Sequence, residues 1–167
     1  ICLGGWHIGQ PAIGDAGAER IMHAAIDNGV TFFDNAWDYH DGRSEEIMGK
    51  ALASGGRRQK VFLMTKNCGR DADHTRQHLE DSLRRLQTDT IDLYQLHWPD
   101  HGTPIEETLR ALDDLVRAGK VRYIGASSMF AWELCEAHHV AERYGLAKFI
   151  SAQDHYNLLY RDIEKRF

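Results

Sequence analysis

The sequence is poor in proline and cysteine, with three of each among 167 residues. The cysteines Cys2, Cys68 and Cys135 are odd in number and widely spaced, which excludes a disulfide framework and favours a reducing cytoplasm. No apolar run approaches the roughly 20 residues that span a bilayer. The chain begins at Ile1 rather than Met, and no basic segment followed by a long apolar stretch indicates a signal peptide. We therefore expect no membrane partner.

The sequence also lacks a dominant charge. Lys and Arg number 20 against 25 Asp and Glu, and the formal net charge of -5 is spread along the chain, which argues against a nucleic-acid partner. No charged tail or low-complexity linker divides it. With 43% hydrophobic residues, residues 1–167 are expected to form a single domain with a sizeable core.

Short apolar runs alternate with segments of helical periodicity along the whole chain. Strands are predicted at residues 2–6, 30–34, 61–66, 93–97, 121–127 and 149–153. Capping signals mark the starts of three of the helices between them: Asp15 before a helix that Gly29 ends, Ser44, and a capping box from Thr103 to Glu106 with Pro104 at the first helical position. A polar stretch that is compatible with a helix follows the last strand.

Six β–α alternations predict a parallel sheet with right-handed crossovers. The sheet is either open and doubly wound or part of an eight-stranded barrel. No G-x-G-x-x-G follows the first strand, which weighs against a doubly wound dinucleotide-binding fold. A closed barrel usually needs about 250 residues, so the chain is about two units short of one.

Three apolar runs end in residues that can carry charge, namely Asp34, Lys66 and His97. Because the carboxyl ends of parallel strands meet at one rim, we expect these side chains to lie together. Lys66 beside Asp34 would be held in place and would lower the pKa of a nearby phenol below its usual value of about 10. Tyr39, five residues after Asp34, supplies that phenol and can act as a general acid toward a carbonyl oxygen. His97 can donate a hydrogen bond to the same oxygen.

At these residues the chain resembles the aldo-keto reductase family. Five segments carry the resemblance in the family's order, at residues 33–46, 64–66, 92–98, 122–127 and 153–159. The resemblance implies a TIM-type (β/α)8 barrel that binds NADP(H) without a Rossmann unit. It also implies a catalytic tetrad of Asp34, Tyr39, Lys66 and His97. Three further residues would bind the nicotinamide carboxamide: Ser127, Ser128 and Gln153. Many family members have Ser-Asn where this chain has Ser127 and Ser128.

The resemblance predicts that the barrel is incomplete here. The sequence ends at Phe167, early in the expected helix after strand 6, so strands 7 and 8 and the main cofactor-binding loops would be missing. A six-stranded remnant would leave open edges and expose apolar interior, which makes self-association plausible while leaving the oligomeric state open. Trp6, Trp37 and Trp98 are candidates for an apolar substrate pocket, with packing at the barrel rim as the alternative for each.

The ten histidines do not suggest a metal site. His74 and His78 are four residues apart on a predicted helix, and His97 and His101 have the same spacing, but no H-E-x-x-H pattern or third ligand accompanies either pair. His74 and His78 are predicted to be solvated.

The sequence therefore predicts an NADPH-dependent reduction of aldehydes or ketones by hydride transfer, with Tyr39 as proton donor. The alternatives are a cofactor-binding, redox-sensing regulatory subunit similar to the potassium-channel β subunits, an inactive truncated fragment, and a zinc hydrolase built on a barrel.

Overall fold

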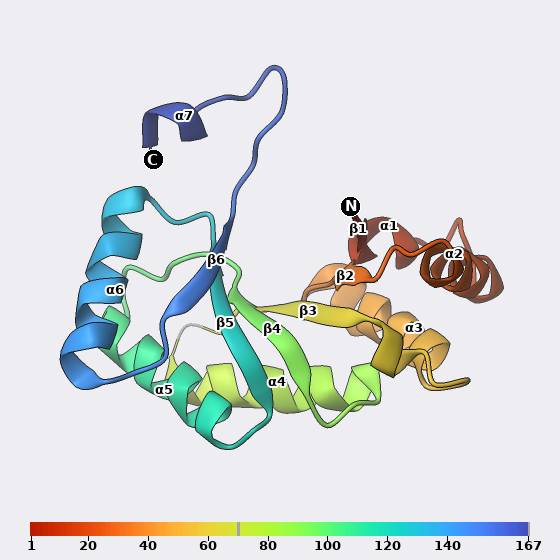
Figure 1. Cartoon of the computed structure of the whole chain (residues 1–167), viewed down its shortest axis with the longest axis horizontal. Helices are drawn as coiled ribbons and strands as arrows, with labels where there is room; N and C mark the ends of the chain where they lie inside the picture. Colours follow the sequence, from red (N-terminus) through yellow and green to blue (C-terminus); the bar gives the residue numbers. More distant parts are fainter. Residues whose placement is uncertain (70, 167) are drawn as a thin grey trace.

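The computed structural model describes residues 1–69 and 71–166, and its strands form one parallel sheet in the order β1-β2-β3-β4-β5-β6 (Figure 1). The strands are β1 (Cys2–Gly4), β2 (Phe32–Asp34), β3 (Phe62–Asn67), β4 (Ile91–Leu96), β5 (Val121–Ser127) and β6 (Phe149–Gln153). Each strand pairs in parallel with the next along the chain. A doubly wound sheet would reverse its strand order part of the way across. The consecutive order is that of a barrel, which confirms the predicted α/β barrel class.

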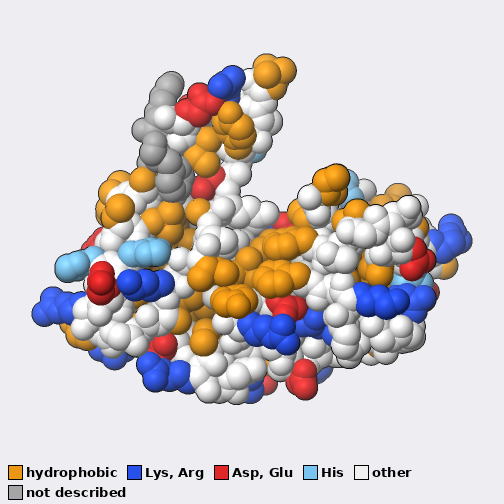
Figure 2. All heavy atoms as spheres, viewed as in Figure 1, with side chains coloured by type: hydrophobic (Ala, Val, Ile, Leu, Met, Phe, Trp, Pro, Cys, Tyr) orange, Lys and Arg blue, Asp and Glu red, His pale blue; other side chains and the backbone are white. Residues whose placement is uncertain are grey.

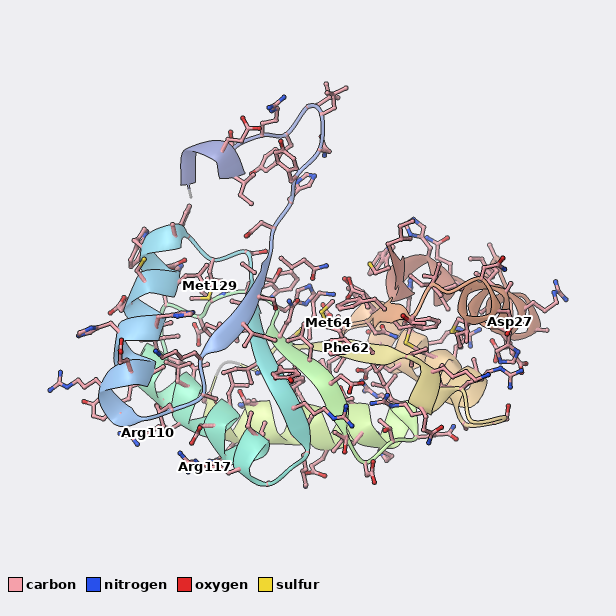
Figure 3. The ribbon with its side chains drawn as sticks, in the orientation of Figure 1. Asp27, Phe62, Met64, Arg110, Arg117 and Met129 are labelled. Atoms are coloured by element: carbon pink, nitrogen blue, oxygen red, sulfur yellow. The ribbon has the colours of Figure 1, made fainter. Side chains whose placement is uncertain are left out.

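The helices follow the strands, with the longer ones covering one side of the curved sheet (Figure 1). They are α1 (Gly5–Ile8), α2 (Asp15–Asp27), α3 (Arg43–Leu52), α4 (Ala72–Leu86), α5 (Ile105–Arg117), α6 (Ala131–Tyr144) and α7 (Ile163–Arg166), with short 3-10 turns η1 (Tyr39–Gly42) and η2 (Arg58–Lys60). From α2 to α6 each helix packs against the next along the chain. Figure 3 labels two residues of α5 in this outer layer, Arg110 and Arg117.

The strand register separates the two faces of the sheet. Phe33 is aligned with Leu63 between β2 and β3, and Tyr94 with Ile124 between β4 and β5. All four side chains belong to the hydrophobic core. The helices contribute their apolar residues to the same core, such as Leu109 and Leu112 of α5, because an amphipathic helix buries its apolar stripe against a sheet.

The opposite face of the sheet carries a different row of aligned residues. Asp34 lies beside Met64, Met64 beside Leu93, and Leu93 beside Tyr123. Nearer the carboxyl ends of the strands, Lys66 lies beside Gln95. Since side chains along a strand alternate between faces, this face is apolar in its middle and polar at its carboxyl end. Figure 3 labels Phe62 and Met64 on β3.

Among residues 1–69 and 71–166, the sheet does not close, because β1 and β6 are not paired with each other. The six strands therefore form a half-barrel, as expected for a barrel that lacks strands 7 and 8. After β6 the chain runs away from the sheet to α7 (Figure 1). Leu158 and Leu159 of this segment are 84% and 94% exposed. Within the described ranges, no helix combines the length and the apolar character that crossing a membrane requires.

Four local predictions were wrong. Ser44 does not cap its helix, because α3 begins at Arg43 after the N-cap Gly42, and the Ser44 hydroxyl donates to the backbone carbonyl of Gly5 at 2.7 Å. Trp6 lies in helix α1 rather than at the end of the first strand. Asp15 is the first residue of α2, whose N-cap is Gly14 with a positive φ of 68°. The Thr103 capping box does not form, because the Thr103 hydroxyl donates to Asp100 at 2.8 Å and α5 begins after Pro104 without a side-chain cap. The Asp100 carboxylate thus competes with the helix backbone for the Thr103 hydroxyl, and the capping pattern takes no account of such a neighbour.

Candidate active site

The carboxyl ends of β2, β3 and β4 bring three of the four predicted tetrad residues to one rim. Asp34 is the last residue of β2, Lys66 lies near the end of β3, and His97 directly follows β4. Each is buried, with exposed fractions of 8%, 3% and 7%. Tyr39, the fourth, is brought to them by the turn η1 that follows β2.

Lys66 connects the members of this group. Its ammonium forms an ion pair with Asp34 Oδ1 and donates to the backbone carbonyl of Asn35 at 3.0 Å. The same Nζ atom lies 3.5 Å from the hydroxyl of Tyr39 and 5.2 Å from the centre of its ring. Because Asp34 and Asn35 fix the ammonium on one side, its remaining hydrogen-bonding capacity is directed at Tyr39.

Tyr39 is packed among aromatic rings and acidic groups. The ring of Trp6 meets it edge-on at 5.2 Å between centroids, and His97 lies at 5.9 Å. Burial, together with the negative charges of Asp34 and Asp38, raises the pKa of Tyr39 to about 12. The predicted lowering of this pKa by Lys66 was therefore wrong. The reason is that Lys66 is already paired with Asp34, so the phenol is surrounded by burial and by carboxylates as well as by the ammonium.

His97 has two neighbours that the sequence did not identify. Its Nδ1 atom lies 3.3 Å from Sγ of Cys68 and 3.4 Å from Oδ1 of Asp38. Trp98 stacks on the imidazole ring at 3.6 Å between centroids, which fixes the plane of the ring. Asp38 and Cys68 occupy the loops after β2 and β3, so their position just past a strand end was the signal that could have identified them.

The three residues predicted to bind a nicotinamide carboxamide lie at the ends of β5 and β6. Ser127 is aligned with Gln153, and the hydroxyl of Ser128 lies 3.4 Å from that of Ser127. Gln153 Nε2 donates to Asp34 Oδ2 at 2.9 Å, which ties β6 to the tetrad. The amide oxygen of Gln153 is buried and has no hydrogen-bond donor among the described residues. A buried acceptor of this kind, beside two hydroxyls, fits the NH2 and C=O groups of a carboxamide.

The three candidate pocket tryptophans have different surroundings. Trp37 stacks on His78 of α4 at 3.7 Å, and its indole N–H donates to Asp81 at 3.4 Å. These contacts favour packing at the barrel rim over a place in a substrate pocket. Trp6 and Trp98 are 49% and 52% exposed; Trp6 meets the ring of Tyr39 edge-on and Trp98 stacks on His97. These two have the surface and the position to contact a substrate.

The histidines considered for metal binding have different surroundings. His78 is buried against Trp37, which corrects the prediction that it is solvated. His74 pairs with Asp71 at 2.8 Å. His101 is 73% exposed in its side chain and lies 3.5 Å from Glu133 on α6. Within the part of the chain that the structure describes, neither pair lies together in one group of possible metal ligands, although His97 lies close to Asp38 and Cys68.

Comparison with known proteins agrees with this geometry. The model of the aldo/keto reductase family matches residues 1–167. The chain is 40% identical over 202 aligned residues to the aldo-keto reductase AMT2 of Alternaria alternata, covering 98% of this chain and 55% of that protein. It is also 40% identical to the uncharacterized oxidoreductase YrpG of Bacillus subtilis, covering 98% of this chain and 56% of that protein.

Two solved structures share the fold. The thermostable aldo-keto reductase Tm1743, in complex with the inhibitor epalrestat, superimposes with a TM-score of 0.89 at 35% identity over 99% of this chain and 61% of that one. An aldo/keto reductase from Klebsiella pneumoniae, in complex with NADP and acetate, gives 0.88 at 34% identity over 98% of this chain and 56% of that one. The chain thus spans about half the length of the curated relatives it matches.

Proposed function

Because the chain belongs to the aldo/keto reductase family, we propose that it carries the catalytic residues for reduction of aldehydes or ketones to alcohols with NADP(H). Asp34, Tyr39, Lys66 and His97 are its catalytic residues. The single observation that carries the proposal is the position of the Lys66 ammonium, which is held by Asp34 while it lies 3.5 Å from the hydroxyl of Tyr39.

Tyr39 is the proton donor in this proposal. Its pKa of about 12 means that the phenol keeps its proton at neutral pH, as a donor to a carbonyl oxygen must. When the proton leaves, the phenolate forms beside Lys66, whose ammonium stabilises the new negative charge. Solvent water then returns a proton to Tyr39 before the next turnover.

His97 and the two tryptophans beside the tetrad position the substrate. The imidazole ring of His97 lies beside that of Tyr39, with centroids 5.9 Å apart, so a carbonyl oxygen that accepts from Tyr39 can also accept from His97. Trp6 and Trp98 present half-exposed apolar surface next to these two residues. Such a setting favours a carbonyl compound with an aromatic or other apolar group.

NADP(H), when bound, supplies the hydride that is transferred to the carbonyl carbon. Ser127, Ser128 and Gln153 would hold its carboxamide, since they offer two hydroxyls and a buried amide oxygen without a donor among the described residues. The hydrogen bond from Gln153 to Asp34 keeps the amide oriented. The NADP complex of the Klebsiella pneumoniae relative supports this choice of cofactor.

Loss of the Tyr39 hydroxyl tests the proposal. The chain is mixed with NADPH and a reactive aromatic aldehyde, and the nicotinamide absorbance is followed. We expect Tyr39→Phe to lower the rate about 10²- to 10⁴-fold, the usual contribution of a positioned general acid. Tyr144→Phe, which changes a partly exposed tyrosine on α6, is the matched control and should keep the wild-type rate.

The assay also separates the alternatives. Binding of NADPH without turnover that depends on Tyr39 would favour a regulatory, redox-sensing role. If the 167-residue chain neither binds nor turns over, the same variants are compared in a chain extended by the C-terminal part of one of the relatives. Turnover that is equal in wild type and Tyr39→Phe, or absent from a folded extended chain with every carbonyl tested, would refute the proposal.

A further inference from the structure

Three potential metal ligands from different loops meet beside the candidate active site. Asp38 follows β2, Cys68 follows β3 and His97 follows β4. A carboxylate oxygen, the thiol sulfur and Nδ1 of the imidazole all lie within 4.8 Å of one another. Since β2, β3 and β4 are neighbours in the sheet (Figure 1), their carboxyl ends bring these loops together.

Two of the three distances between these atoms are those of ligands around one zinc ion. Tetrahedral zinc with Zn–S of about 2.3 Å and Zn–N or Zn–O of about 2.0 Å places S and N about 3.5 Å apart, and N and O about 3.4 Å apart. In the structure Sγ of Cys68 lies 3.3 Å from Nδ1 of His97, and Nδ1 lies 3.4 Å from Oδ1 of Asp38. The third pair, Sγ of Cys68 and the Asp38 carboxylate, lies within 4.8 Å, so a small shift of the thiol completes the geometry.

A second observation concerns Asp38. Its Oδ1 atom is buried, yet it has no well-aligned hydrogen-bond donor among the described residues. A buried carboxylate oxygen without such a donor is costly unless a cation or a further group satisfies it. The ring of His97 is already held by its stack on Trp98, so the imidazole needs little reorganisation to bind an ion.

From these contacts we propose that Asp38, Cys68 and His97 form a binding site for a zinc-class divalent ion. A thiolate and an imidazole select Zn²⁺ or Co²⁺ over Mg²⁺ and Ca²⁺, which prefer oxygen ligands. Three protein ligands leave a fourth position for water or another small ligand. Cys68 also lines a cavity of about 470 Å³, together with Trp98, so one of the three ligands faces open space.

Binding exchanges a proton for the metal. The thiol of Cys68 gives its proton to solvent, because the thiolate is the ligand, and the sulfur–metal bond takes its place. Coordination through Nδ1 of His97 leaves the ring proton on Nε2. The site therefore shares one residue with the proposed tetrad, but the binding of an ion does not depend on the reductase reaction.

Cobalt provides a direct probe of this site. Co²⁺ is added to the reduced chain and the near-ultraviolet absorption of a cobalt–thiolate bond is measured, with Zn²⁺ and Mg²⁺ as competitors. We expect one such band per chain, removed by Zn²⁺ and unaffected by Mg²⁺. Cys68→Ser should abolish it, whereas a variant with both Cys2→Ser and Cys135→Ser, which changes two exposed cysteines, should keep it.

A second variant keeps the test independent of any effect of Cys68→Ser on folding. Asp38→Asn retains the cobalt–thiolate band but should weaken zinc affinity by at least about 10-fold, a loss that even residues outside the first ligand shell can cause. The proposal is overturned if the wild type shows no band, if Cys68→Ser leaves the band in place, if Mg²⁺ removes it, or if Asp38→Asn binds zinc as tightly as the wild type.

Discussion

At the scale of single residues, the surroundings of Tyr39 set the chemistry available to it. Burial and two carboxylates raise its pKa to about 12, while Lys66 lies within reach of the hydroxyl. The neutral phenol is thus favoured before reaction, and the ammonium is placed to stabilise the phenolate that follows proton transfer. A group with these neighbours is better suited to donate a proton than to accept one at neutral pH.

Titration of the phenol tests this environment without any turnover. The difference in tyrosinate absorbance between wild type and Tyr39→Phe is measured as pH rises. Because the phenol ionises near its raised pKa of about 12, we expect no more than about a tenth of the full change in this difference by about pH 11, whereas an ordinary tyrosine with a pKa of about 10 would be mostly ionised there. A transition centred near pH 10 would show that the hydroxyl is not in the environment described.

At the scale of elements, the contact between α3 and α4 positions the loop that carries Tyr39. Arg85 of α4 donates to the backbone carbonyl of Trp37 at 2.9 Å and lies 3.3 Å from the buried carboxylate of Glu45 on α3. Glu45 in turn accepts from Thr65 of β3 at 2.6 Å. Arg85 therefore connects the loop that carries Tyr39 to Glu45 of α3. Glu45 in turn connects Arg85 to β3, the strand that carries Lys66.

Gly49 permits the close approach of these two helices. A Cβ atom at this position of α3 would fall on the backbone carbonyl oxygen of Arg85 and come within 2.8 Å of Leu86 Cα. Backbone atoms at the end of α4 cannot move aside as a flexible side chain can. Gly49 is thus the position where the sequence allows α3 and α4 to meet.

We expect Gly49→Ala to lower the free energy of unfolding by about 1–3 kcal/mol, as overpacking does, although alanine is the better helix former. Urea denaturation measures the change. The matched control is Gly17→Ala on α2, where the new methyl group meets only the Ile13 side chain at 3.3 Å. In this control the free energy of unfolding should stay unchanged or rise by up to about 1 kcal/mol. Equal effects of the two substitutions would contradict the packing of α3 on α4.

At the scale of the whole molecule, the open side of the sheet presents apolar surface, visible at the centre of Figure 2. Phe32 and Phe62 stack at 5.2 Å on this face, and Tyr123 in the next row of the register is 48% exposed. In a closed barrel such side chains fill the interior. Left partly uncovered in a sheet with unpaired edge strands, they favour contact with other chains.

The 167-residue chain should therefore associate as its concentration rises, and sedimentation velocity measures the mean mass. We expect Tyr123→Lys to reduce association, because it places a charge in the apolar row. Trp132→Lys on α6 makes the same change of charge at a side chain that is 62% exposed on the outer layer, and it should associate like the wild type. If both variants behave alike, net charge rather than the open face determines association.

The sequence alone was enough for the order and type of the main elements, because a period of two or of 3.6 residues is a local property of the chain. It was also enough to identify Asp34, Tyr39, Lys66 and His97 as candidates, since strand ends and spacing mark them. Helix starts were less accurate. Thr103, for example, has a local acceptor in Asp100 that competes with the predicted cap.

The tertiary structure decided what no local pattern contains. The direction of the pKa shift of Tyr39 depends on burial and on the pairing of Lys66 with Asp34, groups that meet only when β2 and β3 pair. The burial of His78 depends on Trp37, from a loop 41 positions earlier in the numbering. The proximity of Asp38 and Cys68 to His97 likewise requires three strand ends side by side. Sequence carries each ligand and each charge, but only the packed sheet sets the distances between them, and those distances determine the chemistry.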